Sequence, residues 1–164
     1  MNLMETSAKG IALIRQFEGC KLTAYKPVPT ERYWTIGIGH YGADVKQGQT
    51  ITQAQAEALL VKDIRPIEQI LNKMNVNFRQ SQFDALISWI FNLGAGNFAN
   101  STLKKYIIQR RQDELITDQL VKWVNSCGKP LLGLKKRRVA EANLWLGREA
   151  YKIVGSDNRI VRIN

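Results

Sequence analysis

Residues 17–40, FEGCKLTAYKPVPTERYWTIGIGH, decide the fold, because the chain changes there from helix to strand. Before this stretch, apolar residues recur at helical spacing, and Thr6 or Ser7 is a suitable cap for the helix that they predict. Gly19 stands where a helix-ending glycine is expected. Residues 22–41 then mix β-branched and aromatic residues with prolines and glycines, which predicts a short hairpin or meander.

Helical periodicity returns beyond this segment. Thr52 and Gln55 form a capping box, and Pro66 is expected to kink or split the helix that follows, with Ile67–Met74 as a connecting continuation. Further helices are predicted over residues 83–92, with Ser81 as cap and Gly94 as terminator, and over about 101–111, 113–126 and 133–147. The fold class is α+β and mainly helical.

Composition describes an ordinary globular domain. The chain has 164 residues, of which 45% are hydrophobic and 23% charged, so it can bury a core and is not disordered. No apolar run reaches the roughly 18–20 residues of a membrane-spanning helix. The N-terminus lacks the pattern of a signal peptide, so we expect synthesis in the cytoplasm without an export signal. Cys20 and Cys127 are expected to be free thiols.

The charge is strongly basic, at +10, and unevenly distributed. Residues 1–82 hold 10 basic and 7 acidic side chains, whereas residues 83–164 hold 14 and 7. Such a surplus indicates a polyanionic partner, which could be nucleic acid, an anionic membrane surface or an acidic wall polymer. The basic runs, Lys135–Arg138 and the pairs at 104–105 and 110–111, are either solvated helix faces or attract such a polymer.

Glu18 is the first candidate for chemistry. It follows Phe17 at the end of an apolar helix, where a partly buried carboxyl keeps its proton and can act as a general acid. The turn after Glu18 leads into the predicted strands, so Glu18 and Thr35 could face each other across one cleft. A solvated surface charge is the alternative. His40, the single histidine, is expected to make a structural hydrogen bond or ion pair.

These residues resemble a known family. Phe17-Glu18-Gly19, Ala24-Tyr25 and Trp34 to His40 are similar to the phage-type lysozymes, the endolysin family of glycoside hydrolases; weaker blocks follow between Gln82 and Leu103 and between Trp123 and Glu141. The resemblance implies one catalytic domain over residues 1–164 with a lysozyme-like two-lobed fold. A β-containing lobe over 18–65 and a helical lobe over 75–164 would be joined by a long helix, with the N-terminal helix packing on the helical lobe.

The resemblance also implies site residues. Glu18 matches the family's catalytic Glu, and Thr35 matches its Thr. The family's catalytic Asp is absent: no Asp lies between Glu18 and Thr35, this segment is longer than in T4-type members, and Glu31 is its only carboxylate. Glu31 is therefore the candidate second carboxylate, with a surface residue in an ordinary ion pair as the alternative. Tyr41, Phe91 and Ser101 match sugar-contacting positions, although Phe91 suits a core role at least as well. The tryptophans at 89, 123 and 145 lie on apolar helix faces and are expected in the core.

The implied activity is hydrolysis of the β-1,4 bond between N-acetylmuramic acid and N-acetylglucosamine in bacterial peptidoglycan, causing lysis of the host cell. No cofactor or metal is expected, because no ligand spacing is present. We expect a monomer without stable membrane insertion that acts from the host cytoplasm after a holin permeabilises the membrane, and no nucleic-acid partner. Two alternatives stay open at this point: a basic helical nucleic-acid-binding module, and a catalytically impaired wall-binding protein of the same fold.

Overall fold

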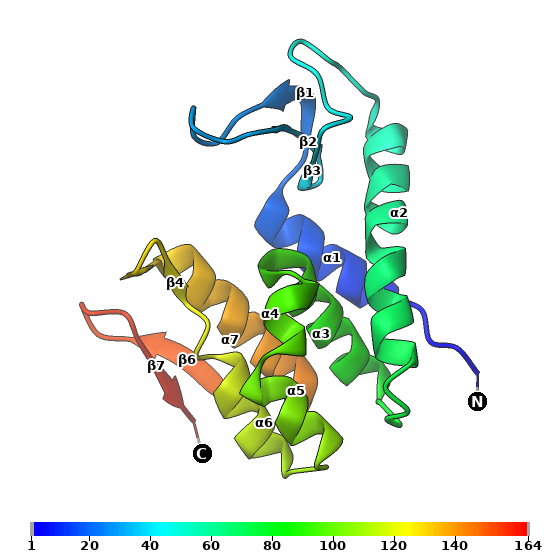
Figure 1. Ribbon diagram of the computed structural model, residues 1–164. Coiled ribbons are helices and arrows are strands. Elements are labelled where there is room, and N and C mark those ends of the chain that lie inside the picture. Colours follow the sequence, from blue (N-terminus) through cyan, green and yellow to red (C-terminus); the bar gives the residue numbers. More distant parts are fainter. Residues whose placement is uncertain (1, 164) are drawn as a thin grey trace. The chain divides into compact units, whose positions relative to one another are not determined.

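The computed structural model describes residues 2–163, which divide into two compact units. Residues 14–66 form one unit, here called the β-containing unit, and the described residues up to 13 and from 67 onward form the helical unit. Helices α1 (Ala8–Glu18) and α2 (Gln53–Asn72) each contribute to both units. The α+β class with an excess of helix, predicted from the sequence, is confirmed (Figure 1).

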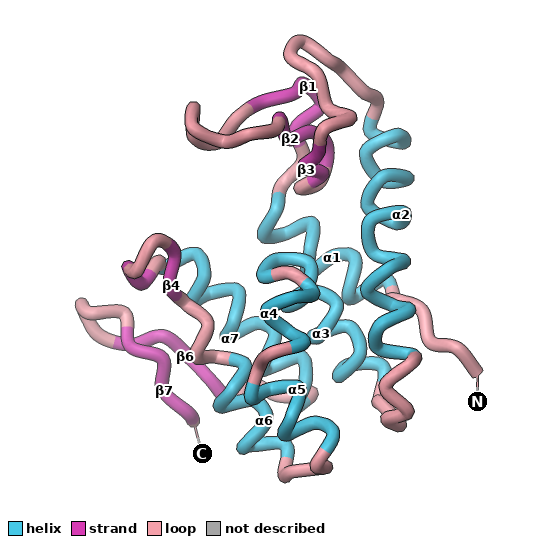
Figure 2. Tube along the Cα trace, in the orientation of Figure 1, coloured by secondary structure: helices cyan, strands magenta, loops and turns pink. Residues whose placement is uncertain are grey.

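The β-containing unit holds a three-stranded antiparallel sheet in the order β1-β2-β3, formed by β1 (Lys21–Tyr25), β2 (Trp34–Gly37) and β3 (His40–Gly42). Ala24, Ile36 and Val45 form its core, against which Trp34, Ile51 and Leu59 pack. The alternation of β-branched residues with glycines therefore produced strands, as predicted. A long loop over residues 26–33 connects β1 to β2, and loops are drawn in pink in Figure 2, whereas only residues 38–39 separate β2 from β3.

The end of α1 is set by Gly19. Its φ of 67° lies in the left-handed region that suits glycine, and its N–H donates to the carbonyl of Arg15 at 2.9 Å. The predicted terminator is thus confirmed. The predicted caps act differently: Thr6 Oγ1 donates to Glu68 and Ser7 Oγ donates to Asp84, so both hydroxyls tie the chain before α1 to other helices.

Helix α2 begins at the predicted capping box. The Thr52 N–H donates to Gln55 Oε1 at 2.8 Å, and the Gln55 N–H donates to Thr52 Oγ1 at 3.1 Å. Pro66 does not split the helix, because α2 is continuous through it, and the predicted continuation from Ile67 belongs to the same helix. Pro66 and Lys62 are both exposed, so water can satisfy the Lys62 carbonyl that the proline leaves without a donor. No helix among residues 2–163 is both long and apolar enough to cross a membrane.

The helical unit is built around α3 (Gln80–Leu93), in which every residue from Gln82 to Ile90 is buried. Ser81 is not its cap, contrary to the sequence prediction: Arg79 occupies that position, and its N–H donates to Gln82 Oε1 at 2.9 Å. Gly94 ends the helix, as predicted. Helices α4 (Ala95–Ala99), α5 (Thr102–Ile108), α6 (Asp113–Leu120) and α7 (Leu132–Leu146) complete the unit.

Two hairpins in the helical unit were not predicted. Strands β4 (Asn125–Ser126) and β5 (Lys129–Pro130) lie within and just beyond the segment predicted as helix over 113–126. Cys127 and Gly128 both have positive φ, of 50° and 75°, which is the backbone of a tight hairpin turn. Strands β6 (Tyr151–Val154) and β7 (Arg159–Arg162) form the second hairpin.

Candidate active site

Glu18 is the last residue of α1, at the point where the chain enters the β-containing unit's sheet. Its side chain is half-buried. The left-handed turn at Gly19 directs the following residues into β1, so Glu18 is held between a helix end and the first strand. A carboxyl in this position has the fixed backbone and partial shielding that a general acid requires.

Thr35 lies at the centre of the sheet. It is the register partner of Tyr25 on β1 and of Tyr41 on β3, and it is only 7% exposed. Because β2 is the middle strand, neighbours on both sides fix the backbone of Thr35. Its hydroxyl is therefore carried by a rigid element, which suits a group that orients a water molecule or a substrate.

Glu31 lies in the loop between β1 and β2. Its N–H donates to the carbonyl of Val28 at 3.1 Å, which closes a turn within the loop, and its side chain is half-buried. Neither an ion pair nor a hydrogen bond of the Glu31 carboxylate is present within residues 2–163. The surface ion pair considered as the alternative for Glu31 is therefore not what this loop contains.

Tyr25 connects these groups. Burial raises the pKa of the Tyr25 phenol, and the negative charges of Glu18 and Glu31 raise it further. The charges of both carboxylates therefore act on this hydroxyl. All three side chains belong to the β-containing unit, in which Tyr25 is the strand partner of Thr35.

Tyr25 belongs to the Ala24-Tyr25 motif, but the sequence predicted no role for it. The available signal was its position: Tyr25 ends the first strand immediately before the loop that carries Glu31. Comparisons with known proteins identify the family of the chain. The model of the family described as phage lysozyme matches residues 15–141, which include Glu18, Thr35 and Glu31.

The chain belongs to the phage lysozyme family. An endolysin of Bacillus phage B103 is 42% identical over 151 residues, which are 92% of this chain and 57% of that relative. The chain therefore spans little more than half the length of the curated relatives that it matches first.

Solved structures show the same fold. The muramidase domain of SpmX from Asticaccaulis excentricus has a TM-score of 0.78 at 31% identity, covering 87% of this chain and 97% of that domain. An endolysin from Escherichia coli O157:H7 phage FAHEc1 has a TM-score of 0.77 at 33% identity, covering 88% of this chain and 95% of that one. The lysozyme-like fold predicted from the sequence is confirmed.

Tyr41, a candidate sugar contact of this phage lysozyme family member, is 48% exposed on β3. Its hydroxyl accepts from the N–H of Tyr33 at 3.3 Å, and the two rings meet edge to face with centroids 5.5 Å apart. Lys26 lies 5.3 Å from the Trp34 ring centroid on the same sheet. This aromatic surface next to Thr35 resembles the surfaces on which sugars pack, because an exposed ring offers apolar area with a polar edge.

His40 has the structural role that was expected. Its Nδ1 lies 2.7 Å from Asp63 and its Nε2 lies 2.8 Å from Asp44. Burial lowers the pKa of His40, but the hydrogen bonds to Asp63 and Asp44 outweigh it, and the net direction is upward. The histidine therefore joins β3, the turn after it and α2 within the β-containing unit, and no group of metal-ligating side chains occurs within residues 2–163.

The other two candidate sugar contacts lie in the helical unit. Phe91 is half-buried near the end of α3. Ser101 is 9% exposed, and its hydroxyl is occupied twice: it donates to the Phe98 carbonyl at 2.7 Å and accepts from the Lys104 N–H at 3.0 Å. Trp89 and Trp145 are buried, as expected. Trp123 follows α6 outside any helix, half-buried against Trp89 with ring centroids 5.3 Å apart.

The basic run at Lys135–Arg138 is not a solvated helix face, contrary to one sequence expectation. Arg137 and Arg138 are buried, and both contact the fully buried Glu141, Arg138 at 2.8 Å and Arg137 at 3.4 Å. Lys135 donates to the carbonyl of Asn158 at 2.7 Å and so anchors the β6–β7 turn. Most of this run is therefore structural.

Proposed function

We propose that the chain hydrolyses the β-1,4 bond between N-acetylmuramic acid and N-acetylglucosamine in bacterial peptidoglycan. The supporting observation is that the charges of Glu18 and Glu31 both act on Tyr25, the strand partner of Thr35. Glycosidic hydrolysis needs one carboxylic acid and one carboxylate near the same bond, and these two side chains supply such a pair.

The roles follow from position. Glu18, on the rigid end of α1, donates its proton to the glycosidic oxygen as the bond from this oxygen to the anomeric carbon breaks. Glu31, on the loop, accepts a proton from a water molecule whose oxygen forms the new bond to the anomeric carbon. Thr35 orients this water through its hydroxyl. The Tyr25 phenol is neutral near neutral pH, and the upward direction of its pKa favours this neutral form further.

Glu31 in this scheme replaces the Asp that the family carries. A loop position lets the carboxylate approach from the side opposite to the acid, and the longer Glu side chain offsets a displaced backbone. Tyr41, Phe91 and Ser101 are proposed to contact the sugars, Tyr41 through its exposed ring. We further propose that the protein acts as a monomer, and that it reaches the wall from the host cytoplasm once a holin has permeabilised the membrane.

The test is release of reducing sugar ends from purified bacterial walls by the unmodified protein, followed together with the fall in turbidity of permeabilised cells. We expect both. Binding to walls without any new reducing ends would overturn the proposal and favour the catalytically impaired wall-binding protein. Retention on DNA at physiological salt without action on walls would favour the nucleic-acid-binding module instead.

A further inference from the structure

Several arginines of the helical unit form ion pairs: Arg137 and Arg138 with Glu141, Arg79 with Asp113, Arg159 with Asp157, and Arg162 with Asp118. Residues 85–112 have a different feature, because this segment contains no acidic residue. Their cations, Lys104, Lys105, Arg110 and Arg111, form no ion pair within residues 2–163.

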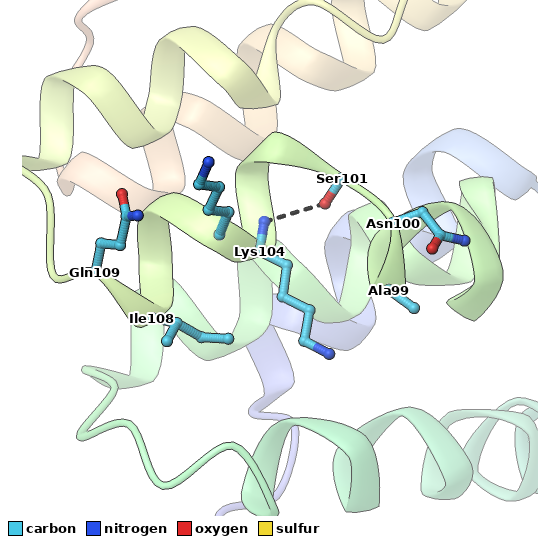
Figure 3. A pocket seen from close by; sticks show the side chains of 7 residues that line it. Ala99, Asn100, Ser101, Lys104, Ile108 and Gln109 are labelled. Atoms are coloured by element: carbon cyan, nitrogen blue, oxygen red, sulfur yellow. Dashed lines mark hydrogen bonds between the residues drawn. The ribbon is translucent and has the colours of Figure 1, made fainter.

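Two of these cations line a pocket. An open pocket of about 380 Å³ lies along α4 and α5, lined by Ala99, Asn100, Ser101, Lys104, Lys105, Ile108 and Gln109. Figure 3 shows the side chains of Lys104, Ile108 and Gln109 along α5, with Asn100 and Ser101 before its start. The lining thus combines two ammonium groups with two carboxamides and an exposed aliphatic side chain.

The pocket has a fixed frame. Phe98 is buried beneath it, and Ser101 joins the Phe98 carbonyl to the Lys104 N–H. Asn100 donates to the Gly96 carbonyl at 3.1 Å, so its side-chain oxygen and nitrogen have a set orientation. Because these bonds hold the backbone, the lysine side chains extend from a rigid support.

The other two cations follow directly. Arg110, two residues beyond the end of α5, has a φ of 52°, and the N–H groups of Arg110 and Arg111 donate to the carbonyls of Ile107 and Tyr106. The Arg111 guanidinium lies 5.3 Å from the Tyr106 ring centroid. Positive charge therefore runs along α5 and continues through the turn after it, which suits a ligand with repeated negative charges more than a single anion.

We propose that the α4–α5 pocket, apart from Ser101, which is assigned above to the sugars, is an accessory binding site for a linear, phosphodiester-bearing polyanion attached to the bacterial wall. This inference rests on the proposed wall-hydrolysing function. Lysine ammonium groups act as point charges that suit phosphate oxygens, and the carboxamides and Ile108 suit the hydroxyls and short alkyl links of an alditol phosphate chain.

Nucleic acid fits this surface less well. Single-stranded nucleic acid is held by exposed aromatic rings on which bases stack. The pocket lining contains no aromatic residue, and the neighbouring Tyr106 ring is covered by Arg111. Binding of such a polymer would keep the enzyme at the wall between cleavage events, because attachment through the pocket raises the local concentration of wall substrate at the active site.

The experiment measures binding of the full chain to a soluble poly(glycerol phosphate) oligomer by fluorescence anisotropy over a range of salt concentrations. The test variant is K104Q/K105Q. The matched control is K136Q/K152Q, which removes the same charge from exposed lysines of the same unit outside the pocket. Poly-glutamate and single-stranded oligo-dT of equal charge serve as the carboxylate and nucleic-acid ligands.

We expect K104Q/K105Q to weaken binding about tenfold at low salt and to reduce the slope of log Kd against log salt by about 1.4, which corresponds to two lost phosphate contacts. The control should bind as the unmodified protein does. Equal weakening in both variants, or tighter binding of oligo-dT or poly-glutamate, would overturn the proposal.

An assay of hydrolysis distinguishes failure of this binding site from failure of the proposed hydrolytic function. On short wall fragments freed of phosphate polymers, both variants should release reducing ends at the unmodified rate. If the unmodified protein releases none, the hydrolytic function fails, whereas the binding measurement still decides the polyanion site by itself.

Discussion

Tyr25 and Thr35 are register partners across β1 and β2, and Tyr25 lies in the electrostatic field of both Glu18 and Glu31. Tyr25 therefore relates the sheet's central threonine to the two carboxyl groups, which the sequence showed only as separate candidates. Since all four residues belong to the β-containing unit, the cluster is a property of that unit alone.

The Tyr25 phenol gives a direct test of this arrangement. Its pKa is raised above the ordinary 10.0 by burial and by the charges of Glu18 and Glu31. Replacing either glutamate by glutamine removes one negative charge, so the Tyr25 pKa should fall in each variant and fall further in the double variant. Titration of the assigned Tyr25 ring signals by NMR measures this. An unchanged pKa in E31Q would place Glu31 away from the cluster.

Glu18→Gln should abolish most activity. Glutamine keeps the size and hydrogen bonding of the side chain but has no proton to transfer, so the rate of wall hydrolysis should fall by at least the roughly 10²–10⁴-fold typical of general acid catalysis. The matched control is Glu57→Gln, at an exposed position of α2 in the same unit, whose ion pair with Arg15 at 3.0 Å is solvent-accessible. Near-normal lysis by E18Q would remove Glu18 from the mechanism.

Glu31→Gln separates a catalytic carboxylate from a surface one. The side chain is half-buried in a loop, so its loss should change the melting temperature little while lowering turnover about 10²-fold or more. Reducing-end release from walls gives the rate, and circular dichroism gives the melting temperature. If E31Q keeps most of its activity, the second carboxylate lies elsewhere, or Thr35 and water suffice.

His40 should make stability depend on pH. In the folded protein the pKa of His40 is raised above 6.5. The stability that its ion pairs contribute is therefore fully present below the pKa of the unfolded state, and it is lost as pH rises through the raised pKa of the folded state. The pKa of Asp44 is lowered by its hydrogen bond to His40, so that contribution is lost only in acid, as pH falls below the usual 3.8.

His40→Gln should consequently lower the melting temperature more at about pH 5 than at about pH 9. Both ion pairs are partly exposed, so the effect should stay near 1 kcal/mol, or about 2–4 °C. Thermal unfolding of both proteins at the two pH values provides the measurement. An equal loss at both would show that the ring acts by packing alone.

Glu141→Gln should destabilise the protein strongly. The carboxylate is fully buried between Arg137 and Arg138 and accepts from Ser88 Oγ at 2.7 Å, so its neutralisation leaves two buried guanidinium groups poorly compensated. Removing one member of such a pair typically costs about 3–5 kcal/mol. The control is Asp157→Asn at the exposed pair with Arg159, for which we expect less than about 1 kcal/mol. Denaturant unfolding of both variants gives these values, and similar losses would contradict the assigned structural role of Glu141.

The sequence by itself determined the local features of this protein. The capping box at Thr52, the glycine ends of α1 and α3 and the strands of the first sheet were all predicted, because each depends on backbone preferences within a few residues. The order of motifs around Glu18 and Thr35 also indicated the family, which the comparisons confirmed.

The tertiary structure decided what depends on distant neighbours. A run of four cations predicts a charged surface wherever it occurs, and only the packing of α7 showed that Glu141 draws Arg137 and Arg138 into the interior. The hairpins at residues 125–130 and 151–162 are both short. The second is held to the rest of the helical unit by contacts such as the hydrogen bond from the Tyr151 hydroxyl to Asp118 at 2.7 Å. Burial and long-range pairing are set by the whole chain, because desolvation of a charge is favourable only when its partner is brought to it.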